Sequence, residues 1–407
     1  MRFAVPTVRF RSPLRGPWLT SVLGVTLLVA LPLVIVTGLL DYLAYGPGQS
    51  IPGDVGLLHL PATDWPSRPS WLFQVTQGLH VGLGMVLVPV VLAKLWSVIP
   101  KLFVFPPITS PAHALERGTL LLLVGGILFE IVTGLMNIQY DYAFGFSFYT
   151  AHYIGAWVFI AGFVSHAVIK LPIARKALRS RSLRAELRIP VSATVQEESD
   201  GPDGLVAPDP APPTMSRRGA LALVGGGAVF VAAITAGQTI GGPLRDLAVL
   251  LPRGRSTFPV NRTAVAAAIQ PAATGTAWRL ALAGPTARTL TRDDLAQLGQ
   301  HTARLPIACV EGWSTVQDWT GVRLRDLAAL AGVPSPASAF VESLDDGPFG
   351  RATLSGGQVL NPDAMLALQV NGTELSPDHG YPARVIVPAL PGVHCTKWVR
   401  SITFRAA

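Results

Sequence analysis

Five apolar stretches, each long enough to cross a lipid bilayer, lie within the first 240 residues. They lie at 18–40, 71–98, 115–137, 149–171 and 219–240. A helix needs about 20 residues to span the hydrocarbon core. Only 14% of the chain is charged, whereas soluble proteins carry about 25%. We therefore predict an all-α transmembrane four-helix bundle over residues 1–175, followed by a fifth transmembrane helix within residues 216–242.

The distribution of basic residues predicts the orientation of these stretches. Arginines and lysines gather before the first stretch, around the 98–115 loop and after the fourth stretch, at Arg2, Arg9, Arg11, Arg15, Lys94, Lys101, Arg117, Lys170, Arg175, Lys176, Arg179, Arg181, Arg184 and Arg188. The 41–70 and 138–148 loops contain Arg68 as their one basic residue. The positive-inside rule therefore places the N-terminus in the cytoplasm. We expect a multi-pass protein of the cytoplasmic membrane of a bacterium.

The net charge of +8 and the pI of about 9.9 would fit a nucleic-acid partner. The basic residues, however, lie beside the apolar stretches, which is where membrane proteins place them. We therefore expect no nucleic-acid function.

Residues 176–215 and 255–407 differ in composition from the apolar region. The stretch 191–214, VSATVQEESDGPDGLVAPDPAPPT, is acidic and rich in proline and glycine, which predicts a disordered cytoplasmic linker over 176–215. Further on, β-like segments alternate with helical stretches. The β-like segments are Trp278–Ala283, Arg384–Val387 and Trp398–Phe404, and the helical stretches include 291–298 and 323–331. We predict a soluble α+β domain over 255–407, on the outer side of the membrane.

Two histidines of the fourth stretch indicate a cofactor within the membrane. His152 and His166 are 14 residues apart, which is roughly 21 Å along a helix and nearly the same face. Each could hold one of two stacked haems, with His80 opposite His152 and His113 opposite His166. Buried, hydrogen-bonded histidines are the alternative, although ionisable groups inside a membrane are costly and usually functional. We expect His59 to be a loop residue.

Short motifs surround these histidines, namely Gly78-Leu79-His80, Lys94-Leu95-Trp96, Ser110-Pro111-Ala112-His113, Thr133-Gly134 and the His152/His166 pair. Together they resemble the cytochrome b-type electron-transfer subunits of membrane dehydrogenases over residues 70–170. The resemblance implies haem b, two per chain, and electron exchange with quinone or quinol. Lys94 departs from the four-histidine pattern of respiratory cytochrome b, and His113 is the candidate for the missing ligand.

A twin arginine, Arg217-Arg218, stands within Ser216–Leu221, directly before the fifth apolar stretch. One interpretation is that two arginines hold the cytoplasmic end of a helix. The other is a signal for the twin-arginine export machinery, which carries proteins that have already folded around a cofactor. The position before an apolar helix and a soluble domain favours the export signal.

Two separated motifs mark the C-terminal domain. Leu305–Leu324 reads LPIACVEGWSTVQDWTGVRL, in which Cys309 follows an apolar β-like run and opens a turn rich in Gly and Trp. A thiolate there is a soft ligand suited to a transition metal. His379–Ile402 reads HGYPARVIVPALPGVHCTKWVRSI, with Arg384 and Lys397 13 residues apart. Both side chains suit a phosphate.

These motifs resemble the molybdopterin domain of the sulfite oxidase superfamily. The residues around Cys309 most resemble its extracytoplasmic methionine-sulfoxide reductase branch. The resemblance implies that Cys309 is the catalytic ligand of molybdenum and that Arg384 and Lys397 hold the pterin phosphate. It also places further residues along the pterin, namely Asn261, His379, Cys395 and Thr396. Position 395 departs from the small hydroxyl residue that is common in that branch.

Other interpretations of these residues stay open at this point. Cys309 and Cys395, the only cysteines, could form a disulfide in an exported domain, or Cys309 could be a buried structural thiol. Arg384 and Lys397 could lie on a solvated sheet edge.

We expect a membrane-bound molybdopterin oxidoreductase. Electrons would pass between the quinone pool and an external oxygen-atom-transfer site through the haems, reducing an oxidised sulfur group on a small molecule or a protein. The alternatives are a sulfite-type dehydrogenase that sends electrons into the membrane, and a non-enzymatic cytochrome anchor for a partner.

Overall fold

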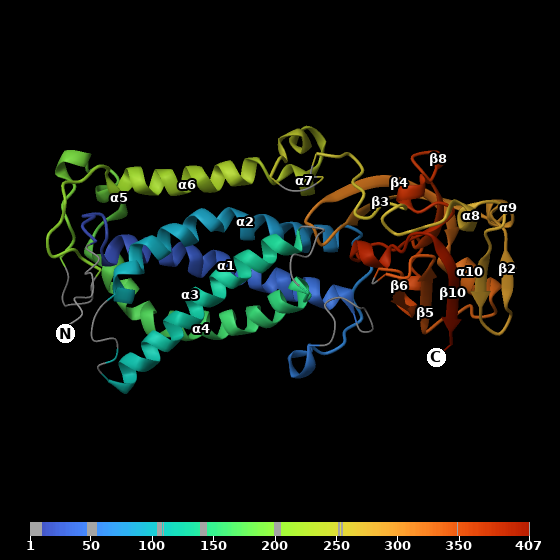
Figure 1. The fold of residues 1–407 in the computed structure, drawn as a ribbon, viewed down its shortest axis with the longest axis horizontal. Coiled ribbons are helices and arrows are strands. Elements are labelled where there is room, and N and C mark those ends of the chain that lie inside the picture. The colour runs from blue at the N-terminus through green and yellow to red at the C-terminus, as the bar shows by residue number, and fades with distance from the viewer. Residues whose placement is uncertain are drawn as a thin grey trace. The chain divides into compact units, whose positions relative to one another are not determined.

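The computed structural model describes residues 10–46, 55–103, 108, 110–138, 145–198, 205–250, 253, 255–347 and 349–406 (Figure 1). The chain divides into two compact units, each built from discontinuous segments. Unit 1 comprises Met1–Ile35, Leu83–Thr133 and His152–Ala232, and unit 2 comprises Val36–Gly82, Gly134–Ala151 and Ala233–Ala407. We describe each unit by itself.

Long helices form at each of the five predicted apolar stretches (Figure 1). They are α1 (Pro17–Tyr45), α2 (Leu72–Val98), α3 (Pro111–Asn137), α4 (Phe148–Ser180) and α6 (Arg217–Ala233), the last followed by α7 (Gly237–Ile240). Within the described residues, these five are long and apolar enough to cross a membrane by length and composition. The prediction of long apolar helices at these positions is confirmed.

Unit 1 packs its helices through leucines and glycines. Its buried cluster joins residues of α1 (Trp18, Leu19, Leu23, Leu27 and Leu31) to Leu87, Val90 and Val91 of α2 and Phe159 of α4. Gly126 and Gly162 allow α3 and α4 to approach closely, because a Cβ at either position would lie about 3 Å from the backbone of the facing helix. Close helix packing of this kind supplies stability where lipid surrounds the outer faces.

The described part of the predicted disordered linker is structured, so that prediction is wrong there. It contains α5 (Leu183–Glu186) and the short helix η3 (Val191–Ala193). Glu186 and Glu197 are buried and form ion pairs with Arg217, at 3.1 and 3.5 Å. The composition of the segment suggested disorder, but two carboxylates find a buried cation that is distant in sequence. Residues 199–204 of the predicted linker lie outside the described residues.

The C-terminal part of unit 2 contains two five-stranded sheets (Figure 1). The first has the order β2-β1-β10-β5-β6, with strands Arg288–Leu290, Leu280–Ala283, Val399–Arg405, Ser338–Ser343 and Arg351–Ser355. Its β1 and β10 are parallel, with Leu282 opposite Ile402, and the other neighbours are antiparallel. The first and last thirds of the domain therefore meet in one sheet.

The second sheet carries the cysteine motif. Its order is β3-β4-β7-β8, with β9 also pairing with β7, and the strands are Gln300–Ala308, Ser314–Arg323, Met365–Val370, Thr373–Glu374 and Arg384–Ile386. The α-helices beside the sheets are α8 (Pro271–Thr274), α9 (Arg292–Gln297), α10 (Leu324–Leu330) and α11 (Gly356–Val359). The short 3₁₀ helices outside unit 1 are η1 (Gly56–Leu58), η4 (Gly242–Leu247), η5 (Pro377–His379) and η6 (Gly392–His394). The predicted α+β domain and its five predicted segments are confirmed.

One end of each of α1 and α2 belongs to unit 2. Tyr45 of α1 and Phe73 of α2 are buried in the same cluster as Trp278 and Leu280 of the α+β domain. The Trp65 indole N–H, in the α1–α2 connection, donates to the carbonyl of Ala389 at 2.7 Å. The ends of α1 and α2 that belong to unit 2 therefore share one hydrophobic core with the α+β domain, which the sequence did not predict.

Candidate active site

Cys309 sits in a tight turn between β3 and β4. The N–H of Gly312 donates to the Cys309 carbonyl at 2.9 Å, and the N–H of Cys309 donates to the Trp313 carbonyl at 2.9 Å. Gly312 has φ of +86°, a conformation that favours glycine, and a Cβ there would lie 2.8 Å from Val81 of α2. Burial raises the pKa of the Cys309 thiol, and the Glu311 carboxylate raises it further. A bound cation would reverse that preference, because coordination deprotonates a thiol.

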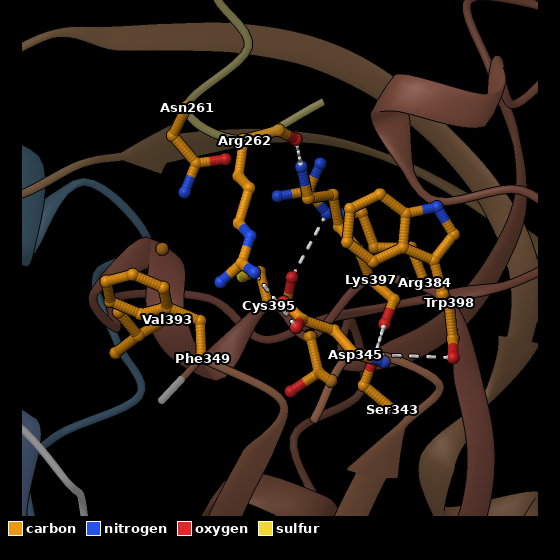
Figure 2. Close-up of a pocket in the computed structure, with 12 residues that line it drawn as sticks. Asn261, Arg262, Ser343, Asp345, Phe349, Arg384, Val393, Cys395, Lys397 and Trp398 are labelled. Carbon is orange, nitrogen blue, oxygen red and sulfur yellow. Dashed lines mark hydrogen bonds and ion pairs between the residues drawn. The ribbon is translucent and has the colours of Figure 1, made fainter. Parts of the chain in front are cut away.

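Close to this turn lies a small pocket lined by two basic side chains that carry positive charge, Arg384 and Lys397 (Figure 2). Arg384, at the start of β9, is 6% exposed, and its guanidinium donates to the carbonyls of Cys395 and His379 at 3.1 and 3.3 Å. The Lys397 ammonium donates to the carbonyls of Arg262 and Asp378. Burial lowers the pKa of Arg384 to about 10.

Neither cation has a carboxylate partner among the residues that the structure describes. The one carboxylate of the cavity lining, Asp345, pairs instead with Arg262 at 3.5 Å. Burial, followed by the nearby Arg384, lowers the pKa of Lys397 to about 7. A buried arginine and a partly buried lysine without an ion-pair partner are costly unless a ligand compensates them. The cavity therefore suits an anionic group such as a phosphate.

Five of the predicted cofactor-binding residues line this one cavity, namely Asn261, Arg384, Cys395, Thr396 and Lys397 (Figure 2). The Thr396 hydroxyl is buried and has no hydrogen-bond partner in the described part of the chain. Such an atom usually marks a missing water or ligand. The donor set therefore fits a pterin phosphate, with the orphaned hydroxyl as a further polar contact.

His379 and Cys309 are next to the cavity but do not line it. The His379 ring stacks on Phe258, with 3.7 Å between centroids, and hydrogen-bonds Ser376 at 2.8 Å. Its carbonyl accepts from Arg384, so it contributes by fixing the arginine. Cys309 and Cys395 share one buried cluster, and both thiols are free. The alternative of a Cys309–Cys395 disulfide is therefore wrong.

Comparison with known proteins assigns this domain. Residues 266–407 match the family described as oxidoreductase molybdopterin binding domain. The C-terminal domain is a molybdopterin-binding oxidoreductase domain of the sulfite oxidase superfamily. The predicted enzyme class, a molybdopterin-dependent oxidoreductase, is confirmed at this level.

The relatives match only part of this chain. Sulfite oxidase of Gallus gallus is 32% identical over 164 residues, which cover 32% of this chain and 36% of that protein. The uncharacterized oxidoreductase YuiH of Bacillus subtilis is 33% identical, over 28% of this chain and 58% of that protein. The solved structure of the sulfane dehydrogenase SoxCD from Paracoccus pantotrophus is 27% identical, over 32% of this chain and 39% of that chain, with a TM-score of 0.30. The chain thus spans between about a third and three fifths of these relatives.

We expect Lys397 to make anion binding by the molybdopterin domain dependent on pH. Its lowered pKa, about 7, means that the cavity gains positive charge as the pH falls through that value. We expect the affinity of the cofactor-free protein for sulfate to rise about tenfold from pH 8 to pH 6. Sulfate stays a dianion over this range, so calorimetric titration reports the protein alone. In Lys397→Met the rise should disappear, and a rise that persists would assign it to another group.

The four histidines predicted as iron ligands lie on three helices. His80 is on α2, and glycine at position 38 of α1 makes room for it, because a Cβ there would lie 2.6 Å from the ring. His113 is in the first turn of α3, where its N–H donates to Ser110 at 3.1 Å. His166 of α4 is half-buried, and its Nδ1 has no hydrogen-bond partner among the described residues. His59, predicted as a loop residue, is exposed beyond η1.

The structure also identifies residues that the sequence did not single out. Arg262, Ser343 and Asp345 join the cofactor cavity, but no motif marks them. Glu130 of α3 lies 3.1 Å from His152 Nδ1. The signal for Glu130 was available, because an acidic residue within an apolar helix is rare and usually functional.

Proposed function

We propose that this protein is a membrane-bound oxidoreductase that passes electrons from quinol through haem b to the molybdopterin domain, which reduces an oxidised sulfur group. The observation that carries the proposal is a hydrogen bond within unit 2. The buried Gln77 side chain of α2 donates to the carbonyl of Val310 at 2.9 Å. Val310 follows Cys309 directly, and Gln77 lies one helical turn before His80. The helix of a proposed haem ligand therefore contacts the turn of the proposed molybdenum ligand.

Further contacts fix the same turn against the apolar helices. Gln74 of α2 donates to the Ser314 hydroxyl at 3.0 Å, and the Thr239 hydroxyl of α7 donates to the Gly312 carbonyl at 3.0 Å. A fixed geometry favours electron transfer inside one chain over transfer through a diffusing partner. The cytochrome anchor without enzymatic activity is therefore the weakest alternative.

The proposed reduction of a sulfoxide by quinol balances in atoms and electrons. A sulfoxide, two electrons and two protons give a sulfide and water, and a quinol supplies both electrons and both protons as it becomes a quinone. Molybdenum, when bound, supplies the two-electron oxygen-atom transfer, and haem carries electrons singly. The protein's own residues would do the rest: Cys309 would ligate the metal, while Arg384, Lys397 and Thr396 would hold the cofactor. Gln77 and Gln74 position the turn.

We propose the membrane arrangement that the basic residues indicate. Four helices form the haem-carrying bundle with the N-terminus in the cytoplasm. The fifth helix carries the molybdopterin domain to the outer face of a bacterial cytoplasmic membrane, after export by the twin-arginine machinery. His80 and His152 would hold one haem, and His113 and His166 the other.

A sulfite-type dehydrogenase is the second candidate, favoured by the similarity to sulfite oxidase. In that case sulfite and water give sulfate, two electrons and two protons, and the electrons enter the membrane. Only the direction of electron flow separates the two candidates.

The direction of electron transfer is the prediction that tests the proposal. The full-length protein would be purified in detergent from a molybdenum-competent host, with molybdenum and haem measured per chain. The haem would first be reduced with quinol in the absence of oxygen. We expect the addition of methionine sulfoxide to oxidise the haem, as its absorption spectrum would show. Reduction of the oxidised haem by sulfite would instead establish the dehydrogenase. Both cofactors present with no response to either substrate would contradict the electron chain, and haem without molybdenum would contradict the enzyme.

A further inference from the structure

His152 of α4 contacts two side chains of α3 through one ring nitrogen. Its Nδ1 lies 3.1 Å from the Glu130 carboxylate and 2.9 Å from the Thr133 hydroxyl. All three residues belong to unit 1. The Glu130 side chain is 11% exposed, so this carboxylate is largely removed from solvent and lipid.

These contacts assign the tautomer of His152. The Thr133 hydroxyl donates its proton to the carbonyl of Phe129 at 2.7 Å, so it accepts from the imidazole. Nδ1 is therefore the protonated nitrogen, and Glu130 is its second acceptor. In this tautomer the basic lone pair is on Nε2, which is the nitrogen that a metal would bind.

The arrangement is built into both helices. Gly155 lies one turn after His152, and a Cβ there would be 2.3 Å from the Glu130 carboxylate and 2.6 Å from the Phe129 ring. Glycine is therefore needed on α4 for the carboxylate to reach His152. An acidic residue within an apolar helix costs free energy and needs a partner. The partner of Glu130 is the imidazole N–H.

We infer that Glu130 is a positioning residue that acts through His152 to lower the reduction potential of the haem that His152 holds. The inference rests on the proposed function, since it requires haem at His152. A carboxylate that accepts from the far nitrogen of an imidazole ligand orients the ring and makes it a stronger electron donor. A stronger donor stabilises ferric over ferrous iron, and ligand hydrogen bonding is one of the levers that set haem potentials.

The test is the midpoint potential of the haem in Glu130→Gln, measured by optical titration of the full-length protein in detergent. Glutamine keeps the size and an acceptor oxygen but removes the charge. We expect the potential of one haem to rise and its ferric paramagnetic resonance g values to shift. Thr133→Val, which removes the neutral acceptor, should produce a smaller change. Glu198→Gln is the matched control, because it removes the same charge at an exposed position and should change neither reading.

The outcomes separate this inference from the function on which it rests. A wild-type preparation without haem would refute the proposed function. Haem at the wild-type level in Glu130→Gln, with an unchanged potential and unchanged g values, would overturn the role of Glu130 alone. If Glu130→Gln loses haem, the inference is tested with Thr133→Val instead. A haem potential and g values equal to those of the wild type in Thr133→Val would overturn the inference.

Discussion

Cys309→Ser is expected to reduce turnover by at least about a hundredfold while leaving the haem content unchanged. The loss should exceed the 10- to 100-fold that changes around a metal ligand typically cost, because here the proposed ligand itself is replaced. A hydroxyl is a hard ligand in the place of a soft thiolate, so the bound molybdenum should also fall or its spectrum change. The fold should survive, since burying an extra hydroxyl costs about 1–3 kcal/mol.

Cys395→Ser is the matched control for that experiment. Both cysteines are buried in the same cluster, at 8% and 2% exposure, and the substitution is the same. Cys395 lines the cofactor cavity and stands where the similar branch often has a small hydroxyl residue, so Cys395→Ser should retain molybdenum. Turnover and molybdenum per chain would be compared in both variants. If Cys395→Ser loses the metal and Cys309→Ser keeps it, then Cys395 and not Cys309 is the molybdenum ligand.

Local patterns predicted most of the fold. The apolar stretches and the short β-like segments are properties of neighbouring residues, and the long helices and strands such as β10 formed where those properties indicated. The motif around Cys309 placed the thiol in a turn, and the comparisons confirmed the molybdopterin domain. Such features depend on chain geometry that a sequence shows directly.

The missed features depend on pairs of residues that are distant in the chain. Glu130 and His152 come from different helices, so their contact depends on how α3 and α4 pack. Arg262 and Asp345 meet in the cofactor cavity from segments more than 80 residues apart. The acidic, proline- and glycine-rich composition of the linker predicts disorder, although Glu186 and Glu197 are buried there. Composition does not reveal a distant buried cation.

One arginine of the twin-arginine motif has a structural role in the folded protein. The Arg217 side chain is 1% exposed, and it contacts Glu186, Glu197 and the carbonyl of Val195, the last at 2.9 Å. Arg218, its neighbour, is exposed. The folded protein therefore uses Arg217 structurally, whereas an export signal would require both arginines to be read before this contact forms.

Arg217→Ala is expected to destabilise the part of unit 1 around residues 181–198 by about 3–5 kcal/mol, because it leaves two buried carboxylates without their shared cation. Glu186 would keep Arg181 at 2.8 Å, but among the described residues Glu197 would keep only the backbone N–H groups of Trp18 and Leu19. Hydrogen exchange and protease cleavage across residues 181–198 would measure the loss. Arg218→Ala, on the exposed neighbour, should change stability by less than about 0.5 kcal/mol.

The same pair of variants decides whether the motif is an export signal. Protease accessibility of the molybdopterin domain in spheroplasts reports on which side of the membrane it lies. If Arg218→Ala keeps its protection from exchange but leaves the domain inside, the export machinery reads the motif. If Arg218→Ala exports normally and only Arg217→Ala fails, the arginine acts through its ion pairs, and the domain must cross the membrane by a route that does not depend on the pair.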